Sequence, residues 1–459
     1  MIDKQSAVAL GVTAGLGVGY LLGKAQPAVL RASSASPKKT ETKPKAAESL
    51  DEVERLIRPN ILALTPYRCA RDDYDQGILL DANENSLGPP LEGHEQLRAM
   101  ELERYPCPYQ PDLKRAITDF RNEKSTEKIS ADNTFLGVGS DEAIDLIIRV
   151  ACTPRVDNIL ITPPTYGMYS VCANIHDVEV VDVPLKIEAP VENPKGLKEG
   201  LPLPSFHIDP QEILDAATAT TKVIFLCSPG NPTANVLRLK DVERILNSEV
   251  GTIASLLQGS SIVEGNEATG FVVVDEAYID FADVSSLCTL VNQHKRLIVL
   301  QTLSKGFGLA GIRLGIAFGD PRLIQVLNNV KAPYNISKLT SDVARKAFAN
   351  LDELRKNVNL IKEVSAYCDK QHGRLLIKEL QKLSFMRCVY ASDSNFVLFE
   401  VCVCIPHALA IYRQMADRGV VIRYRGNQHL LTNCLRATIG SREENDRMLE
   451  LLVEVSGEQ

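Results

Sequence analysis

The chain contains 459 residues, of which 45% are hydrophobic and 24% are charged. These proportions are typical of soluble globular proteins, so neither a disordered chain nor a polytopic membrane protein fits the whole sequence. The formal net charge of −7 excludes a general electrostatic attraction to nucleic acid, although local basic clusters can still bind small anions. The length is sufficient for roughly two or three domains.

The first part of the chain, residues 1–49, differs in composition from the rest. Residues 7–23 are apolar and uncharged, and glycine recurs there at every fourth position. As a helix, residues 7–22 are about 24 Å long, slightly short of a bilayer core of about 30 Å. Proline, serine, alanine and lysine dominate residues 25–48, as in a disordered basic linker.

We expect residues 7–23 to anchor the chain to a membrane. The positive charge that follows the run favours a body on the cytosolic side, so the predicted location is cytoplasmic with a membrane tether. Two alternatives remain open, namely a flexible glycine-rich leader and a cleaved signal or organelle presequence.

The eleven cysteines are scattered and form no CxxC pair. An odd, scattered set argues against a disulfide framework and against a zinc ribbon. We therefore expect a reducing compartment and no bound metal.

Beyond residue 50 the sequence alternates between short apolar runs and helical patterns. The runs at 223–226, 271–274 and 297–300 are continuously apolar, which indicates strands that are buried on both faces and paired in parallel. The segment after Gly139 has apolar residues at i, i+3 and i+4 and predicts a helix with Ser140 as its N-cap. These patterns predict an α/β fold with a mostly parallel central sheet.

Polar side chains follow each predicted strand, where open α/β sheets bind their ligands. They supply a lysine amine, a carboxylate, a phenol, an amide, hydroxyl groups and an arginine. Pyridoxal phosphate requires a lysine for its aldehyde, an acidic partner for its ring nitrogen and an anion site for its phosphate. The candidates are Asn231, Asp275, Tyr278, Thr302, Ser304, Lys305 and Arg313.

From about residue 52 to residue 454 the chain resembles the fold-type I, pyridoxal-phosphate-dependent aminotransferases. Within that group it is similar to the histidinol-phosphate aminotransferases, particularly the fungal forms. The motifs that carry the resemblance lie at 58–61, 65–67, 80–85, 104–106, 139–142, 164–169, 229–233, 274–278, 302–305, 309–313, 331–335, 394–396 and 434–436.

The resemblance implies two domains. Residues 111–330 would form the large cofactor-binding domain around the mostly parallel sheet. Residues 331–459 would form a smaller α/β domain, to which the N-terminal arm, residues 50–110, contributes.

The resemblance also implies roles around the cofactor ring. Lys305 would bind the cofactor covalently and then move a proton between the substrate carbon and the cofactor. Asp275 would keep the ring nitrogen protonated, and Tyr166 would stack on the ring face. Asn231 and Tyr278 would bond the ring hydroxyl oxygen.

A second set of residues would hold the cofactor phosphate. The backbone at Ser140 and Asp141, at the start of the predicted helix, would bind it together with Thr302, Ser304 and Arg313. Tyr105 would reach the phosphate of a neighbouring subunit's cofactor, which makes the expected active unit a homodimer.

Substrate binding depends on fewer residues. Arg436 would hold the α-carboxylate of glutamate, and the same fork suits the phosphate of histidinol phosphate. Arg423 matches a second family arginine, with a plain surface charge as the alternative, and Tyr67 and Asn83 would line the same mouth. We expect Arg425 to be solvated.

Three features depart from the family pattern. Ala234 stands where glycine commonly follows Asn-Pro-Thr, at an expected cost of about 1 kcal/mol if the backbone there needs a positive φ. Gly306 follows the lysine where alanine is frequent, a change that we expect to be tolerated. Residues 249–270 are predicted to form an inserted surface loop.

The implied reaction converts L-histidinol phosphate and 2-oxoglutarate to imidazole-acetol phosphate and L-glutamate, a step of histidine biosynthesis. One alternative is another enzyme of the same fold, either an aminotransferase for aromatic or other amino acids or a decarboxylase of a phosphorylated amino acid. The other is a membrane-tethered binding protein without activity.

Overall fold

The computed structural model describes residues 51–64, 95–188, 203–248, 270–365, 376–402 and 407–457. Residues Leu50–Gln459 form one compact unit. The leader, nearly all of the predicted inserted loop, and the candidates Tyr67 and Asn83 lie outside the described residues, so the predictions about them stay predictions. Within the described ranges, no helix is both long and apolar enough to cross a bilayer.

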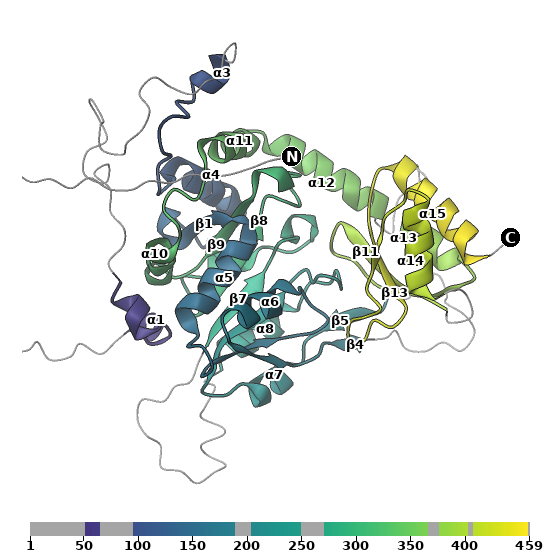
Figure 1. Cartoon of the computed structure of the whole chain (residues 1–459), viewed down its shortest axis with the longest axis horizontal. Helices are drawn as coiled ribbons and strands as arrows, with labels where there is room; N and C mark the ends of the chain where they lie inside the picture. The colour runs from purple at the N-terminus through teal and green to yellow at the C-terminus, as the bar shows by residue number, and fades with distance from the viewer. Residues whose placement is uncertain are drawn as a thin grey trace, which may run out of the picture. The chain divides into compact units, whose positions relative to one another are not determined.

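A seven-stranded sheet forms the centre of this unit (Figure 1). Its strands are β1 (Thr134–Val138), β2 (Asn158–Ile161), β3 (Glu179–Asp182), β6 (Thr221–Cys227), β7 (Phe271–Asp275), β8 (Leu297–Thr302) and β9 (Leu314–Phe318). Their order is β1-β9-β8-β7-β6-β2-β3. The neighbours from β8 to β3 pair in parallel, whereas β9 runs antiparallel to both β1 and β8. The prediction of a mostly parallel sheet is confirmed.

The three predicted apolar runs fall within β6, β7 and β8. Their side chains point alternately into two hydrophobic layers, as Val223 and Phe225 do on one face and Ile224 and Leu226 on the other. Both faces are covered, which explains why these strands are apolar at successive positions.

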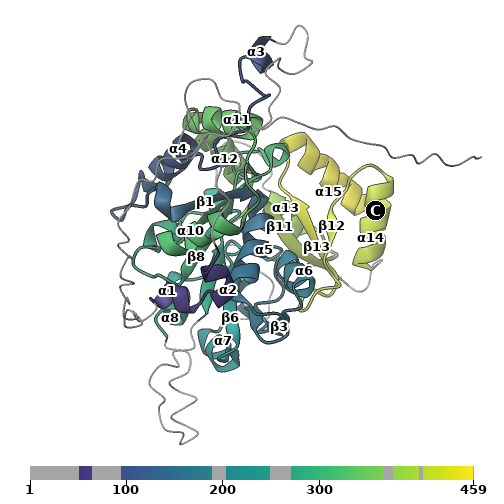
Figure 2. The ribbon, with the colours of Figure 1, turned by 60° about the vertical axis from the view of Figure 1, so that its left-hand side comes forward.

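Helices cover the two faces of the sheet (Figures 1 and 2). On one face lie α1 (Glu52–Arg55), α5 (Gly139–Ala151), α6 (Met168–Ile175) and α10 (Pro321–Val330), with α2 (Pro59–Leu62) beside α10. On the other face lie α4 (Pro111–Asn122), α7 (Pro210–Ala216), α8 (Leu239–Leu246) and α11 (Lys338–Phe348). The alternation of strands and helices thus gives the predicted α/β architecture.

The helix predicted after Gly139 is α5, but its start differs from the prediction. The helix begins at Gly139 itself, and Val138 is the N-cap without a side-chain hydrogen bond. The assignment of Ser140 as the N-cap was therefore wrong. Gly139 adopts φ +73°, a conformation that glycine reaches without a Cβ clash, so the turn into the helix comes earlier than a serine cap would place it.

A second, four-stranded sheet lies in the C-terminal part of the chain (Figure 1). It consists of β10 (Met386–Val389), β11 (Phe396–Val401), β13 (Cys434–Thr438) and β12 (Arg423–Tyr424), in that order and antiparallel. One face packs on α13 (Leu376–Lys382), α14 (Ala408–Asp417) and α15 (Arg442–Ser456).

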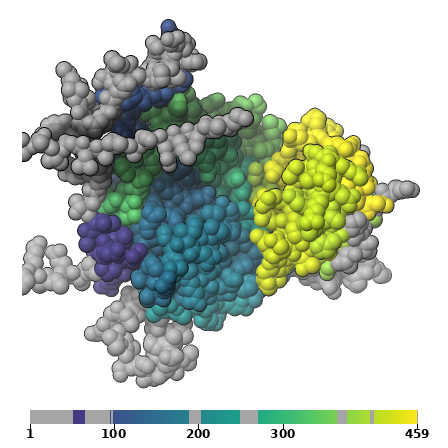
Figure 3. Space-filling model, viewed as in Figure 1, coloured from purple at the N-terminus to yellow at the C-terminus, as the bar shows by residue number. Residues whose placement is uncertain are grey.

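The opposite face of this sheet turns toward the central-sheet region. Leu398 and Cys434 belong to the same hydrophobic cluster as central-sheet residues, and Phe396 packs with Ala234 and Tyr278. The space-filling view shows the C-terminal part, in yellow, against the central part (Figure 3). The predicted domain boundaries at 110/111 and 330/331 stay a prediction.

Short elements complete the described structure. They are α3 (Glu95–Arg98), β4 (Lys186–Glu188), β5 (Ser205–His207), and the 3-10 helices η2 (Ala131–Asn133), η3 (Ile279–Phe281), η4 (Leu287–Leu290) and η5 (Ala310–Ile312). The longer helix α12 (Leu351–Ser365) follows α11.

Candidate active site

Asp275 is the last residue of β7 and is buried. Its carboxylate accepts a hydrogen bond from the Tyr169 hydroxyl at 2.8 Å and another from the Ala277 backbone N–H at 3.1 Å. Burial raises the pKa of this carboxyl to about 6, although both hydrogen bonds and the charge of Lys305 favour the ionised form. Asp275 is therefore a buried acid whose ionisation a nearby cation would strongly favour.

Tyr169 is a site residue that the sequence analysis missed. Its side chain is fully buried, and its ring stacks on Phe225 with the centroids 4.6 Å apart. Burial and the neighbouring Asp275 raise the pKa of the Tyr169 hydroxyl well above its usual value, so it stays protonated and donates to the carboxylate. Tyr166 lies just before the first residue of α6, and Tyr169 lies in the first turn of that helix, so the two rings meet although only one of them was assigned to the site.

Lys305 follows β8, the strand that pairs with β7. Its side chain is half-buried, and its Nζ lies 5.7 Å from the centroid of the Tyr278 ring. Burial, together with the charges of Arg436 and Arg313, lowers the pKa of the Lys305 amine. A lowered pKa increases the fraction of the neutral amine, which is the nucleophilic and basic form.

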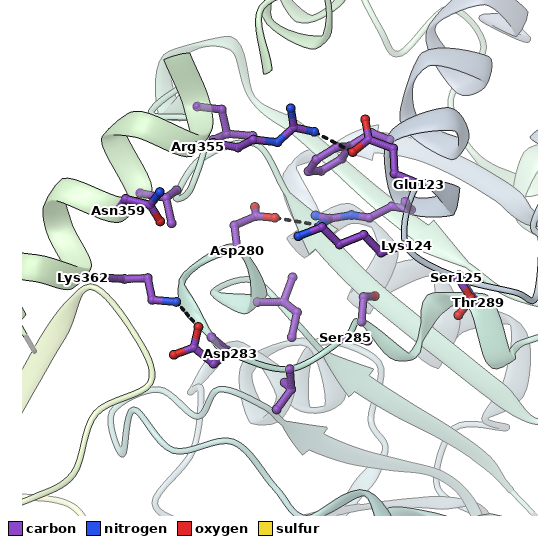
Figure 4. Close-up of a pocket in the computed structure, with 18 residues that line it drawn as sticks. Glu123, Lys124, Ser125, Asp280, Asp283, Ser285, Thr289, Arg355, Asn359 and Lys362 are labelled. Atoms are coloured by element: carbon purple, nitrogen blue, oxygen red, sulfur yellow. Dashed lines mark hydrogen bonds and ion pairs between the residues drawn. The ribbon is translucent and has the colours of Figure 1, made fainter. Parts of the chain in front are cut away.

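Behind Lys305, Gly306 packs directly on Asp280. A Cβ at position 306 would lie 2.6 Å from both the Cβ and Oδ2 of Asp280. Asp280 cannot move away easily, because Arg121 donates to it at 2.7 Å and the same guanidinium donates to Gln301 at 2.7 Å. This ion pair lines a cavity of about 560 Å³ between α4, η3 and α12 (Figure 4).

Gly306→Ala is therefore expected to lower the free energy of unfolding by about 1–3 kcal/mol, the usual effect of overpacking. We also expect a lower kcat, since the clash displaces the neighbouring Lys305. Chemical denaturation and steady-state kinetics test this. The matched control is Gly311→Ala, where nothing lies within 4 Å of the added Cβ. Equal stability of the two variants would show that Asp280 does not restrict position 306.

An anion cradle forms where α5 begins. The Cβ that Gly139 lacks would lie 2.6 Å from Nη2 of Arg313, so the glycine leaves room for the guanidinium. Arg313 also donates to the Ser304 hydroxyl at 3.4 Å and lies 3.7 Å from the Asp141 carboxylate. The structure thus brings a helix N-terminus, a hydroxyl group and a guanidinium together, as the sequence analysis expected.

Thr302, Ser304 and Tyr166 adjoin this cradle. The Thr302 and Ser304 hydroxyls are 2.9 Å apart, and the Ser304 backbone N–H donates to the Thr302 hydroxyl at 3.1 Å. The Tyr166 hydroxyl donates to Asp141 at 3.0 Å, and its ring meets Tyr169 edge-on. Thr302 and Ser304 therefore contact each other, and Tyr166 reaches the same region through Asp141.

Arg436 reaches the site from the second sheet. Its Nη1 donates to the side-chain oxygen of Asn231 at 2.5 Å, and its guanidinium carbon lies 4.9 Å from the centroid of the Phe396 ring. Burial lowers the pKa of Arg436. This contact joins the loop after β6 to β13 and brings a cation to the mouth of the site.

Two further arginines, Arg423 and Arg425, lie near Arg436 and differ in their exposure. Arg423 is exposed and lies opposite Arg436 in the strand pairing. Arg425, which we expected to be solvated, is half-buried, and its Nε is buried without a hydrogen-bond partner among the described residues. That expectation was wrong because the polar surroundings of Arg425 in the sequence do not reveal the sheet contact that covers it.

Two further positions bear on the predictions. Ala234 is fully buried and adopts φ +64°, so the backbone there has the conformation in which alanine costs more than glycine. Tyr105 is 52% exposed, and its ring stacks on Tyr334 with the centroids 4.6 Å apart.

Comparisons with known proteins identify the family. The family model for aminotransferase class I and II matches residues 75–452. The histidinol-phosphate aminotransferase of Candida maltosa is 42% identical over 414 residues, covering 87% of this chain and 97% of that protein. That of Saccharomyces cerevisiae is 41% identical over 418 residues, covering 88% and 97%.

A solved structure shows the same fold. The histidinol-phosphate aminotransferase of Sinorhizobium meliloti, in complex with pyridoxal 5′-phosphate, superposes with a TM-score of 0.60 at 23% identity, over 82% of this chain and 90% of that one. The identity to the fungal relatives extends over nearly their whole length. The chain therefore belongs to the histidinol-phosphate aminotransferase family of the class I and II aminotransferases.

Proposed function

We propose that this chain is a pyridoxal-phosphate-dependent enzyme that transaminates L-histidinol phosphate with 2-oxoglutarate, giving imidazole-acetol phosphate and L-glutamate. This is the activity for which its relatives are named, and it would be a step of histidine biosynthesis. The observation that carries the proposal is the placement of the buried Asp275 at the end of β7 and of the half-buried Lys305 just after the neighbouring parallel strand β8, with Arg436 and Arg313 close to the lysine.

The residues at the strand ends fit the cofactor. Lys305 offers an amine of lowered pKa for the aldehyde, and Asp275 offers a buried carboxylate for the ring nitrogen. The cradle of Gly139, Ser304 and Arg313 fits the phosphate, because a side chain at position 139 would occupy the place of the guanidinium. When bound, pyridoxal phosphate supplies an electron sink that makes the bonds at the substrate α-carbon easier to break.

The protein's own groups then have separate tasks. Asp275 provides the negative charge that keeps the ring nitrogen protonated, with Tyr169 fixing its orientation. The Lys305 amine accepts a proton from the substrate carbon and returns it, for which its lowered pKa is suited. Tyr278 and Asn231 orient the ring hydroxyl, and Tyr166 covers the ring.

Charged ends of the substrates would meet the arginines. Arg436 and Arg423 would bind a carboxylate of glutamate or the phosphate of histidinol phosphate, with Tyr67 and Asn83 lining the same mouth. One set of cations must therefore serve two substrates in turn.

We accordingly expect ping-pong kinetics. Double-reciprocal plots at several concentrations of the second substrate should be parallel, and each substrate should inhibit competitively against the other at high concentration. Initial-rate measurements test this. Intersecting lines would show that both substrates bind at once and would contradict a shared site.

The substrate assignment is tested by comparing amino donors. A coupled assay that detects glutamate, run with 2-oxoglutarate and histidinol phosphate, phenylalanine or threonine phosphate, should give the highest kcat/KM with histidinol phosphate. A higher value with phenylalanine would favour an aromatic aminotransferase, and carbon dioxide release from threonine phosphate would favour a decarboxylase.

We also propose a homodimer in which Tyr105 contacts the neighbouring subunit's cofactor phosphate, which the 52% exposure of Tyr105 supports. Sedimentation should give the mass of a dimer, and Tyr105→Phe should weaken cofactor binding.

The proposal for residues 7–23 is a membrane anchor with the catalytic body in the cytosol, and the sequence alone supports it. Fractionation of the full chain and of a chain that starts near residue 50 should place only the full chain with membranes. If both remain soluble, there is no anchor.

A further inference from the structure

Three arginines share one face of the second sheet. Arg423 pairs with Arg436 across β12 and β13, and the Arg425 backbone N–H continues this ladder by donating to the Cys434 carbonyl at 2.9 Å. Side chains two residues apart on a strand leave the sheet on the same side. Arg425 therefore projects on the side of Arg423 and Arg436.

This side faces the proposed catalytic centre. Arg436 donates to Asn231, and the charges of Arg436 and Arg425 both act to lower the pKa of the Tyr278 hydroxyl, which burial raises to about 12. Leu398 and Cys434, on the same side of the sheet, pack in the hydrophobic cluster of the central sheet. Arg425 is thus close enough to act electrostatically on Tyr278, the residue over whose ring the Lys305 amine lies.

The positive charge of this cluster is not balanced by the described residues. The Nε atoms of Arg425 and Arg436 are buried and have no hydrogen-bond partner there. The pKa of Arg425 falls to about 10, first because of burial and then because of Arg436 and Arg423. Among the described residues, neither Arg425 nor Arg436 forms an ion pair with a carboxylate, and the phenol of Tyr278 is a group whose charge would stabilise both cations.

The chemistry of the two substrate classes differs at this point. A carboxylate carries one negative charge and two acceptor oxygens, which one guanidinium can bind with its fork. A phosphate monoester carries about −1.5 to −2 charge at pH 7 and three acceptor oxygens. The guanidinium of Arg425 therefore offers a positive charge and hydrogen-bond donors beyond those that a carboxylate of glutamate needs.

We propose that Arg425 is a specificity-determining residue that contacts the phosphate of a phosphate-monoester amino donor and makes the site prefer that donor to its unphosphorylated analogue. The inference rests on the proposed function and adds a residue to it. Glutamate uses Arg436 and Arg423 in the other half-reaction, and Arg425 contributes little there. The preference for a phosphorylated amino alcohol therefore depends on a residue that glutamate binding does not need.

The test compares Arg425→Gln and Arg425→Lys in the cofactor-loaded enzyme. The glutamine variant should raise KM for histidinol phosphate about 10- to 100-fold, the usual effect of losing a charge-assisted contact, with a much smaller change in kcat. KM for glutamate and for unphosphorylated histidinol should change by less than about 3-fold. Arg425→Lys should recover part of the loss, since it keeps the charge without the fork.

Two measurements separate a phosphate contact from a general loss of structure. Inorganic phosphate should inhibit the wild-type enzyme competitively against histidinol phosphate and should inhibit the glutamine variant more weakly. The ratio of wild-type to variant kcat/KM for histidinol phosphate should also shrink below about pH 6, where the ester becomes a monoanion. Arg418→Gln, which removes an exposed arginine paired with Glu454 on the second-sheet side, is the matched control and should show neither effect.

The outcomes separate the two proposals. If the wild-type enzyme uses histidinol phosphate but Arg425→Gln leaves its KM unchanged, or raises the KM values for glutamate and histidinol equally, the role of Arg425 is wrong while the proposed function stands. If the wild-type enzyme with bound cofactor does not transaminate histidinol phosphate at all, both proposals are wrong.

Discussion

Lys305→Ala is expected to abolish the visible absorbance of the lysine-bound cofactor and to lower kcat by about 10⁴-fold or more. The variant loses both the amine that binds the aldehyde and the base that moves the proton at the substrate carbon. Because Lys305 is half-buried and overlies Tyr278 at 5.7 Å, its truncation removes little packing, and the fold should persist.

Absorbance spectra of the protein with added pyridoxal phosphate and single-turnover kinetics provide the measurement. The control is Lys346→Ala, which truncates a lysine that is 75% exposed and should leave the spectrum and kcat unchanged. Circular dichroism confirms the fold of both variants. An unchanged spectrum in Lys305→Ala would refute the assignment of the cofactor-binding lysine.

The second large effect is expected for Asp275→Asn. Without the negative charge the ring nitrogen loses its proton and the electron sink weakens, so kcat should fall about 10³-fold or more, a barrier increase of about 4 kcal/mol. The KM values should change far less, since Asp275 is buried and its carboxylate accepts a hydrogen bond from Tyr169 rather than from an arginine. A kcat within 10-fold of the wild-type value would exclude Asp275 as the partner of the ring nitrogen.

The same substitution should have the opposite effect on the stability of the cofactor-free protein. Burial raises the pKa of Asp275 from 3.8 to about 6, so the folded state holds this proton more tightly than the unfolded state. The contribution of Asp275 to the free energy of unfolding therefore falls by up to about 3 kcal/mol as the pH rises from about 4 to about 6. Above about pH 6 it stays at this lower value. Asparagine does not ionise, so the Asp275→Asn variant does not lose stability in this way as the pH rises.

Thermal unfolding of the cofactor-free proteins at pH 4.5 and pH 8 tests the sign of the stability difference between the variant and the wild type. Asp275→Asn should be more stable than the wild type at pH 8, and the difference should shrink at pH 4.5. Asp342→Asn, which changes a partly exposed carboxylate on α11, should show no comparable pH-dependent gain. A destabilised Asp275→Asn protein at pH 8 would show that Asp275 stabilises the empty site.

These two predictions point to a general property of the site. Asp275 is held by Tyr169, and the charge that would favour its ionisation comes from the cofactor rather than from a strong ion pair. The arginine cluster on β12 and β13 likewise lacks a described carboxylate and would gain its counter-charge from the substrate. We therefore expect cofactor binding to stabilise the buried carboxylate and substrate binding to stabilise the arginine cluster.

The sequence by itself determined the strands and the chemistry at their ends. Continuous apolar runs place β6, β7 and β8, because a strand covered on both faces needs apolar residues at successive positions. Parallel strands end at one edge of the sheet, so Asn231, Asp275 and Lys305 could be assigned to one site from their positions after these runs.

The tertiary structure decided contacts between distant segments. Tyr169 and Asp275 are 106 residues apart, and Arg436 and Asn231 are 205 residues apart, so local periodicity carries no information about either pair. The burial of Arg425 and the contact of Gly306 with Asp280 likewise depend on the packing of one element against another. Local pattern fixes which face of an element is apolar, whereas side-chain pairing across elements depends on where the complete chain brings those faces together.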